Sequence, residues 1–276
     1  MSGAETEKHA ASEAADVDAP LPERRVDTED VATGVRLITF NRPAVRNAFD
    51  TAMYLAFTQA LLDADGDEDV RAVVITGRGG GFSSGQDLVE MAAMAAGTAV
   101  EGSGRGFTGL LDAVTEIAVP LLAAVNGVAV GLGFTMLAHC DLVLVDAAAR
   151  LRVPFAELGV PAEAASSVLF PARMGWQRAA RVLLTSDWIG ADEAVELGMA
   201  LRVCPEGMVV DETVALASRI AAHPRAATRA ITALMREGQR DLVRAANQRE
   251  QAAFARLLGG AATAGALAEF TAKASP

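Results

Sequence analysis

The sequence predicts an α/β fold, and three observations carry this prediction. An apolar run at 35–40 is followed by a segment with helical spacing at 51–63 and by a second apolar run at 70–76. Strand, helix and strand in this order are typical of parallel pairing. The 276 residues are 51% hydrophobic, which is ample for a buried core. Finally, two glycine-rich turns, at 77–88 and 126–135, each lie between a strand-like and a helix-like run.

Composition excludes some classes of function. A net charge of -11 and only 5% aromatic residues argue against a nucleic-acid partner, which needs a concentrated basic face. No apolar run is long enough for a membrane helix, and the N-terminus is acidic rather than signal-like. Cys140 and Cys204 lie in apolar contexts without metal-ligand spacing, so we expect free thiols and no metal site. These features predict a cytoplasmic protein.

The first elements follow an acidic tail. Residues 1–24 are rich in Ala, Glu, Asp and Pro without hydrophobic periodicity, which predicts disorder. The strand at 35–40 should end at Pro43, which cannot continue a hydrogen-bonded ladder. Asp50 is a good N-cap for the helix at 51–63. The run at 70–76 then predicts a buried strand.

The turn at 77–88 contains five glycines, which let the backbone approach a ligand closely. Asp87 can cap a helix that begins near Leu88, which would leave the amide of Gln86 exposed. The stretch GFSSG at 81–85 also fits the nucleophile elbow of α/β hydrolases, with Ser83 as nucleophile and His223 as its histidine. However, several residues separate Ser83 from the preceding strand, so the spacing is wrong for an elbow.

The turn at 126–135 follows an apolar run at 120–125 and leads into a helix-like segment that reaches Cys140. Gly131 and Gly133 allow a sharp turn that points the amide of Leu132 outward at a helix N-terminus. Such an amide can stabilise a developing oxyanion or enolate. A lone turn of this kind is more often a packing feature, but the similar turn upstream favours a ligand site.

The remaining segments are less informative. Residues 89–106 are rich in Met, Ala and Gly and could cover a long apolar ligand, or form a surface loop with a short helix. A helix at 107–119 and a strand at 141–145 are expected, and helical segments follow residue 167.

Several motifs, taken together, resemble the crotonase, or enoyl-CoA hydratase/isomerase, superfamily. They are NRP at 41–43 with Asn47 and Ala48, FSSGQDL at 82–88, PLLAAVNGVAVGLG at 120–133, DLVLVDAAARL at 141–151, and LLTSDWIGADEAVELGM at 183–199 ahead of Val203. The resemblance implies a spiral of ββα units at 25–206, and a helical trimerisation region at 207–276. It also implies acyl-CoA substrates and a homotrimer or dimer of trimers, with coenzyme A as part of the substrate and no other cofactor.

The resemblance also assigns candidate site residues. The thioester oxygen would lie between the backbone amides of Gln86 and Leu132, the pair that the glycine turns indicate independently. The backbone around four residues would hold the CoA adenine and pantetheine: Arg46, Asn47, Ala48 and Ser84. Phe270 and Lys273 have the spacing of a C-terminal pair that reaches a neighbouring subunit's CoA, although a solvated helix end explains them equally well.

The carboxylates indicate which reaction is catalysed. The two glutamates that enoyl-CoA hydratases use are replaced here by Thr135 and Phe155, which makes hydration a poor expectation. The segment around Glu163 instead resembles the peroxisomal-type 3,2-enoyl-CoA isomerases, whose corresponding glutamate is the catalytic base. Two departures are that Pro161 is one residue farther from the glutamate, and that the flanking glycine is Ala164.

The expected function is therefore 3,2-trans-enoyl-CoA isomerisation in fatty-acid metabolism, with Glu163 as the base. A single carboxylate can move a proton from C2 to C4, and its apolar loop should raise its pKa. Glu157 is the main rival, because in an extended segment it would share a face with Phe155, although a solvent-facing position before Leu158 is favoured for it. Two alternatives remain open: another crotonase-type reaction, including hydration, and a catalytically inactive acyl-CoA-binding protein.

Overall fold

A computed structural model of the chain describes residues 24–98 and 103–274. The tail predicted at 1–24 lies outside this part except for its last residue. Among the described residues, no helix combines the length and the hydrophobicity needed to cross a bilayer.

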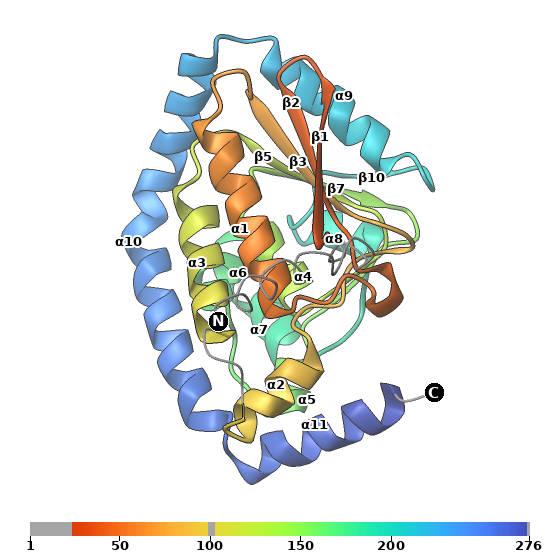
Figure 1. Cartoon of the computed structure of the whole chain (residues 1–276), viewed down its shortest axis with the longest axis vertical. Coiled ribbons are helices and arrows are strands. Elements are labelled where there is room, and N and C mark those ends of the chain that lie inside the picture. Colours follow the sequence, from red (N-terminus) through yellow and green to blue (C-terminus); the bar gives the residue numbers. More distant parts are fainter. Residues whose placement is uncertain (1–23, 99–102, 275–276) are drawn as a thin grey trace, which may run out of the picture.

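A six-stranded sheet forms the centre of the molecule (Figure 1). Its strands, in spatial order, are β1 (Val26–Ala32), β2 (Val35–Phe40), β3 (Ala72–Gly77), β5 (Leu121–Val125), β7 (Leu142–Asp146) and β10 (Arg202–Cys204). Only β1 and β2 pair in antiparallel fashion, and the other neighbours are parallel as predicted. Sequence analysis missed β1, whose central residues are exposed and polar and carry no apolar run.

A second sheet consists of four short strands, and three of them follow strands of the large sheet along the chain. It consists of β4 (Gly81–Ser83), β6 (Val128–Val130), β8 (Arg150–Arg152) and β9 (Ile189–Gly190). Each of β3, β5 and β7 in the large sheet is followed by β4, β6 or β8 in the small sheet, and then by helix. β4, β6 and β8 pair in parallel, so the chain advances as a spiral of ββα units, as expected.

Helices cover both faces of the large sheet (Figure 1). On one side lie α1 (Thr51–Gly66) and α3 (Ser103–Glu116), which pack on each other, and on the other lies α9 (Val209–Ala221). Asp50 caps α1 as predicted, since its Oδ1 accepts the amide of Met53 at 2.7 Å. The helix expected at 107–119 begins four residues earlier and ends at Glu116.

The remaining helices surround the small sheet and the C-terminal edge. They are η1 (Pro43–Val45), α2 (Leu88–Ala95), α4 (Leu132–Thr135), η2 (Met136–His139), α5 (Phe155–Leu158), α6 (Ser166–Met174), α7 (Trp176–Thr185), α8 (Ala191–Glu196), α10 (Arg225–Leu257) and α11 (Ala261–Ala274). The region at 207–276 is thus helical where it is described. The 33-residue helix α10 runs along the whole molecule and passes α3 and α6 (Figure 1).

Candidate active site

The two glycine-rich turns pack directly against each other. A Cβ atom added to Gly85 would lie 2.6 Å from the carbonyl oxygen of Val130 and 3.3 Å from the amide nitrogen of Leu132. Gly85 also has a φ of +85°, which disfavours any side chain. A Cβ on Gly133 would lie 2.5 Å from the carbonyl oxygen of Ser83. Glycine is therefore required on both turns, and the amides of Gln86 and Leu132 are brought close together.

Both amides are free to bind a ligand. Gln86 forms a parallel bridge with Phe49, in which the carbonyl of Gly85 and the amide of Asp87 point toward Phe49. The Gln86 N–H and the Gly85 C=O belong to the same trans peptide group and point in opposite directions, so the Gln86 amide points away from Phe49. Leu132 is the first residue of α4, a position without an intrahelical acceptor. Within the described chain, neither amide donates to a backbone carbonyl. Both amides are thus available as donors, which an oxyanion hole requires.

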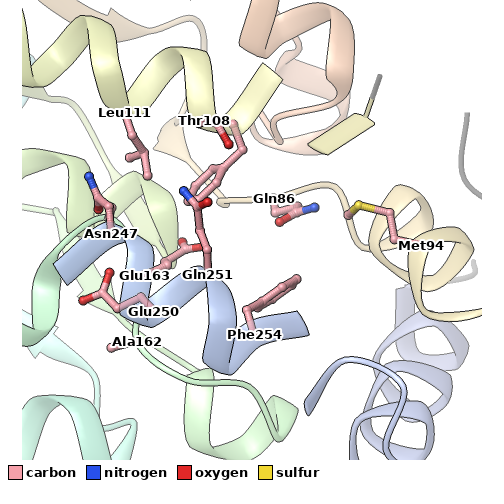
Figure 2. Close-up of a pocket in the computed structure, with 12 residues that line it drawn as sticks. Gln86, Met94, Thr108, Leu111, Ala162, Glu163, Asn247, Glu250, Gln251 and Phe254 are labelled. Atoms are coloured by element: carbon pink, nitrogen blue, oxygen red, sulfur yellow. The ribbon is translucent and has the colours of Figure 1, made fainter. Parts of the chain in front are cut away.

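A cavity of about 190 Å³ lies next to these turns. Its walls come from α2, α3, the loop before α6, and α10, and they are formed by Gln86, Met94, Phe107, Thr108, Leu111, Ala162, Glu163, Ala164, Asn247, Glu250, Gln251 and Phe254. Figure 2 shows Gln86 and Met94 on one side and Glu163, Glu250 and Asn247 on the other. The structure thus brings the predicted base and one predicted oxyanion residue to the same cavity.

Glu163 lies in a short loop between α5 and α6 that has an unusual backbone conformation. The next two residues, Ala164 and Ala165, have φ values of 55° and 54°, in the left-handed region. This conformation costs an alanine about 1–2 kcal/mol relative to the right-handed one. Glycine adopts a left-handed φ more easily than alanine does, so the surroundings must hold both alanines in this conformation.

The surrounding side chains hold this loop from two sides. Nε2 of His139 donates to the carbonyl oxygen of Ala164 at 2.8 Å. From α10, the carboxylate of Glu250 accepts the amide of Ala165 at 2.7 Å and that of Ser167 at 2.9 Å. Each charge-assisted bond of this kind stabilises by about 1.5–3 kcal/mol, enough to offset the left-handed alanines.

The environment of Glu163 raises the pKa of its carboxyl group. Burial raises the pKa of Glu163 to about 8, and the negative charge of Glu250 adds to this effect. Burial also raises the pKa of Glu250, although its hydrogen bonds from Ser167 and Ala165 act in the opposite direction. A base with a pKa near the working pH gives efficient proton transfer.

His139 should make the loop sensitive to acid. Burial lowers the pKa of His139 to about 4, so the folded protein holds the neutral imidazole. The unfolded chain binds the extra proton below about pH 6.5, so stability is lost as the pH falls from about 6.5 toward 4. We expect the stability advantage of the wild type over His139→Gln to shrink by about 2 kcal/mol between pH 7 and pH 4. Denaturant unfolding at both pH values measures it, with His223→Gln, an exposed histidine, as the control.

The two positions where hydratases carry glutamates are closed to that role. Thr135 is fully buried in α4, where its hydroxyl faces the carbonyl oxygen of Leu132. Phe155 is buried, and its ring lies 4.0 Å from the Cβ position of Gly131, beside the oxyanion turn. An apolar ring therefore occupies the second position that the resemblance assigns to a hydratase glutamate.

The condition that made Glu157 a rival base, an extended segment, is not met in the structure. Residues 155–158 form the short helix α5 rather than an extended segment, so Glu157 does not share a face with Phe155. Its carboxylate pairs with Arg152, and it does not line the described cavity.

The interpretation of GFSSG as a hydrolase nucleophile elbow is wrong. Ser83 is fully buried in β4, where its hydroxyl donates to the carbonyl oxygen of Asn47 at 2.9 Å and accepts the amide of Gly85 at 3.1 Å. His223 is exposed at the end of α9, and no histidine of the described chain bonds to Ser83. The serine shapes the first oxyanion turn instead of attacking a substrate.

The four residues proposed for CoA binding lie side by side. The amide of Ser84 donates to the carbonyl oxygen of Arg46 at 2.8 Å, and Ser83 and Arg42 donate to the carbonyls of Asn47 and Ala48. The side chain of Asn47 is buried and ties this segment to the carbonyl of Gly81. None of the four lines the cavity of Glu163, so a CoA contact there would lie outside it.

Phe270 and Lys273 lie in α11, and their side chains are outside the described residues.

Sequence reasoning missed three residues near Glu163. Glu250 and Asn247 reach the cavity from α10, and Oδ1 of Asn247 is buried without a hydrogen-bond partner in the described chain. Tyr54 of α1 is also buried, with a hydroxyl that lacks a partner there. Burial, followed by the charge of Glu163, raises the pKa of Tyr54. A polar residue in an otherwise buried helical stripe is the one signal that could have drawn attention to them.

The comparison with protein families decides the classification. A family model described as Enoyl-CoA hydratase/isomerase matches residues 30–275, nearly the whole described chain. The chain belongs to the enoyl-CoA hydratase/isomerase family. The spiral of ββα units agrees with this assignment.

Individual members of this family that resemble the chain differ in their reactions. Enoyl-CoA delta isomerase 2 of Rattus norvegicus is 35% identical over 220 residues, which cover 79% of this chain but only 56% of that protein. The 4-chlorobenzoyl coenzyme A dehalogenase-2 of Arthrobacter sp is 32% identical over 221 residues, which cover 79% of this chain and 80% of that protein. An enoyl-CoA hydratase/isomerase structure from Pseudoalteromonas atlantica superposes with a TM-score of 0.84 at 31% identity, over 91% of this chain and 98% of that one.

Proposed function

We propose that this enoyl-CoA hydratase/isomerase family member is a 3,2-trans-enoyl-CoA isomerase. The observation that carries the proposal is that Glu163, a carboxylate with a raised pKa, lines the same cavity as Gln86, whose amide is free. The similarity to an enoyl-CoA delta isomerase supports this reading. Neither of the two positions assigned to hydratase glutamates carries a carboxylate, since Thr135 and Phe155 stand there, and this argues against hydration.

The residues can perform each step of the reaction. With the thioester oxygen held by the amides of Gln86 and Leu132, the Glu163 carboxylate removes a proton from C2 of the 3-enoyl group. The electron pair of that C–H bond forms a dienolate, whose charge the two amides stabilise. The protonated Glu163 then delivers the same proton to C4, the double bond moves to C2–C3, and the carboxylate is regenerated. One proton moves and no co-reactant is consumed.

The cavity fits an acyl chain. Met94, Phe107, Leu111 and Phe254 give it largely apolar walls, as an aliphatic group requires. Its volume of about 190 Å³ equals roughly six water molecules at about 30 Å³ each. The helix α2 contributes Met94 to the wall, so one residue of the Met-rich segment at 89–106 lines the cavity.

The pH dependence of turnover should report Glu163. Because the carboxylate is the active form and its pKa is about 8, kcat/KM should rise with pH and level off above about pH 8. A profile that is flat between pH 6 and pH 9 would contradict the role of Glu163 as base.

The test of the proposed function is conversion of trans-3-hexenoyl-CoA to the 2-enoyl product, with crotonyl-CoA hydration measured in parallel. Isomerisation without hydration supports the proposal. Hydration alone would show a hydratase-like enzyme, and CoA-ester binding without either reaction would show an inactive acyl-CoA-binding protein.

A homotrimer, or a dimer of trimers, is the assembly that we propose. Exposed apolar side chains on α10 support self-association, since they are costly to leave in water. They are Ile231, Leu234, Met235 and Leu242. Sedimentation of the purified protein measures the assembly.

A further inference from the structure

Glu250 is a buried carboxylate that the proposed reaction does not use. It lies on α10, 85 residues after the loop of Glu163, and only 7% of its surface is exposed. Its two oxygens are bound separately: Oε2 accepts the amide of Ala165 at 2.7 Å, and Oε1 accepts the amide of Ser167 at 2.9 Å. The carboxylate thus spans the junction between the loop and α6.

The loop depends on such an anchor. Ala164 and Ala165 are both left-handed, a conformation that alanine leaves readily when nothing holds it. If either residue relaxed, the direction of the chain at Glu163 would change. His139 holds the carbonyl of Ala164, but only Glu250 binds the amide of Ala165 among the described residues.

We propose that Glu250 is a positioning residue, whose carboxylate fixes the amides of Ala165 and Ser167 and thereby aims Glu163 into the cavity. The inference deepens the proposed isomerase function and rests on Glu163 as its base. Glu250 itself need not touch the substrate.

The charge of Glu250 also acts on Glu163. Among the surrounding groups, Glu250 from α10 is the charged one that raises the pKa of Glu163. Tyr54 from α1 stays protonated, His139 from η2 stays neutral, and Arg249 acts on Glu250 by lowering its pKa. Removing the charge at 250 should therefore lower the pKa of Glu163 from about 8, but not to its ordinary value, because burial is the larger cause.

The test is Glu250→Gln in the full chain. The glutamine side chain keeps one acceptor oxygen, but its NH₂ group faces a backbone N–H and cannot accept from it. Hydrogen exchange of the backbone amides of Ala165 and Ser167 should therefore accelerate. A displaced base lowers kcat at least about tenfold. KM should stay within about twofold, because substrate binding is unaffected. The rising limb of the pH profile should move to lower pH.

Asp65→Asn is the matched control. Asp65 also accepts two backbone amides, those of Ala118 and Val119, both at 3.0 Å, but it does not line the described cavity. Asp65→Asn can destabilise the fold, but the variant should keep the wild-type pH profile of turnover. Should Glu250→Gln fail to fold, Glu250→Asp keeps the charge and withdraws it from the loop, so kcat should fall while the pH profile stays close to that of the wild type.

Amide exchange separates failure of this inference from failure of the proposed function, since it needs no substrate. Unchanged exchange at Ala165 and Ser167 in Glu250→Gln overturns the positioning role, whatever the reaction. Wild-type kcat and an unshifted profile in that variant overturn it as well. If the wild type does not isomerise 3-enoyl-CoA but exchange accelerates, the proposed function fails and the loop anchor stands.

Discussion

Replacing Glu163 by Gln should lower kcat for 3-enoyl-CoA isomerisation by about a thousandfold, within the range of general acid–base catalysis. The amide has the size and shape of the carboxyl group but cannot accept and return the proton. Affinity for the acyl-CoA should remain, because the two oxyanion amides belong to other segments. Initial-rate kinetics and calorimetric titration with a substrate analogue measure the two quantities.

Folding provides an internal check on this variant. The pKa of Glu163 is raised in the folded protein, so the folded chain binds the proton more tightly than the unfolded chain does. The stability that this proton gives is present below the ordinary pKa and is lost as the pH rises through about 8. Glu163→Gln lacks this loss and should be at least as stable as the wild type at pH 8.

Glu157→Gln is the matched control, since its carboxylate is paired with Arg152 outside the cavity. Substantial turnover by Glu163→Gln, or equal losses in both variants, would contradict the role of Glu163.

Replacing Gly85 by Ala should lower kcat by about a hundredfold, the usual cost of losing one oxyanion-hole donor. The new Cβ would lie 2.6 Å from the carbonyl of Val130, which is closer than any normal contact. Relief of this clash must separate the two turns and displace the Gln86 and Leu132 amides from each other. The φ of +85° at Gly85 adds backbone strain, so a lower melting temperature should accompany the loss.

Gly80→Ala separates these effects from the general consequences of an added methyl group. Gly80 lies in the same turn, but a Cβ there meets no atom within 4 Å. Wild-type activity in Gly80→Ala together with wild-type kcat in Gly85→Ala would show that the two turns do not form the oxyanion hole.

Much of the fold could be predicted because the signals were local. The apolar runs at 70–76 and 120–125 predicted buried parallel strands, and Asp50 and Asp87 predicted helix starts that the structure confirms. The strand β1 was missed, because an edge strand with exposed polar residues lacks the periodicity that identifies a strand. The three-residue strands β6 and β8 were missed as well, because they are too short to carry a pattern.

The residues of the candidate site also fall into those that the sequence could predict and those that it could not. The free amides of Gln86 and Leu132 follow from glycine spacing, and the turns that carry them do pack together. Glu163 was selected through resemblance, and its cavity position supports the choice. Glu250, Asn247 and Tyr54 were not selected, because the polarity of a helical position does not show which distant loop that position will meet. Glu157 was a rival only if its segment were extended, and the structure has a four-residue helix there instead.

The position of α10 has a consequence for the order in which the enzyme becomes competent. A chain emerging from the ribosome presents both glycine turns and the loop of Glu163 long before residue 250. Domains fold largely from the N-terminus during synthesis, and contacts between distant residues form late. The N-terminal sheet can therefore assemble while the loop with its left-handed alanines still lacks its anchor. Catalytic competence should appear as one of the last events of synthesis, when α10 docks.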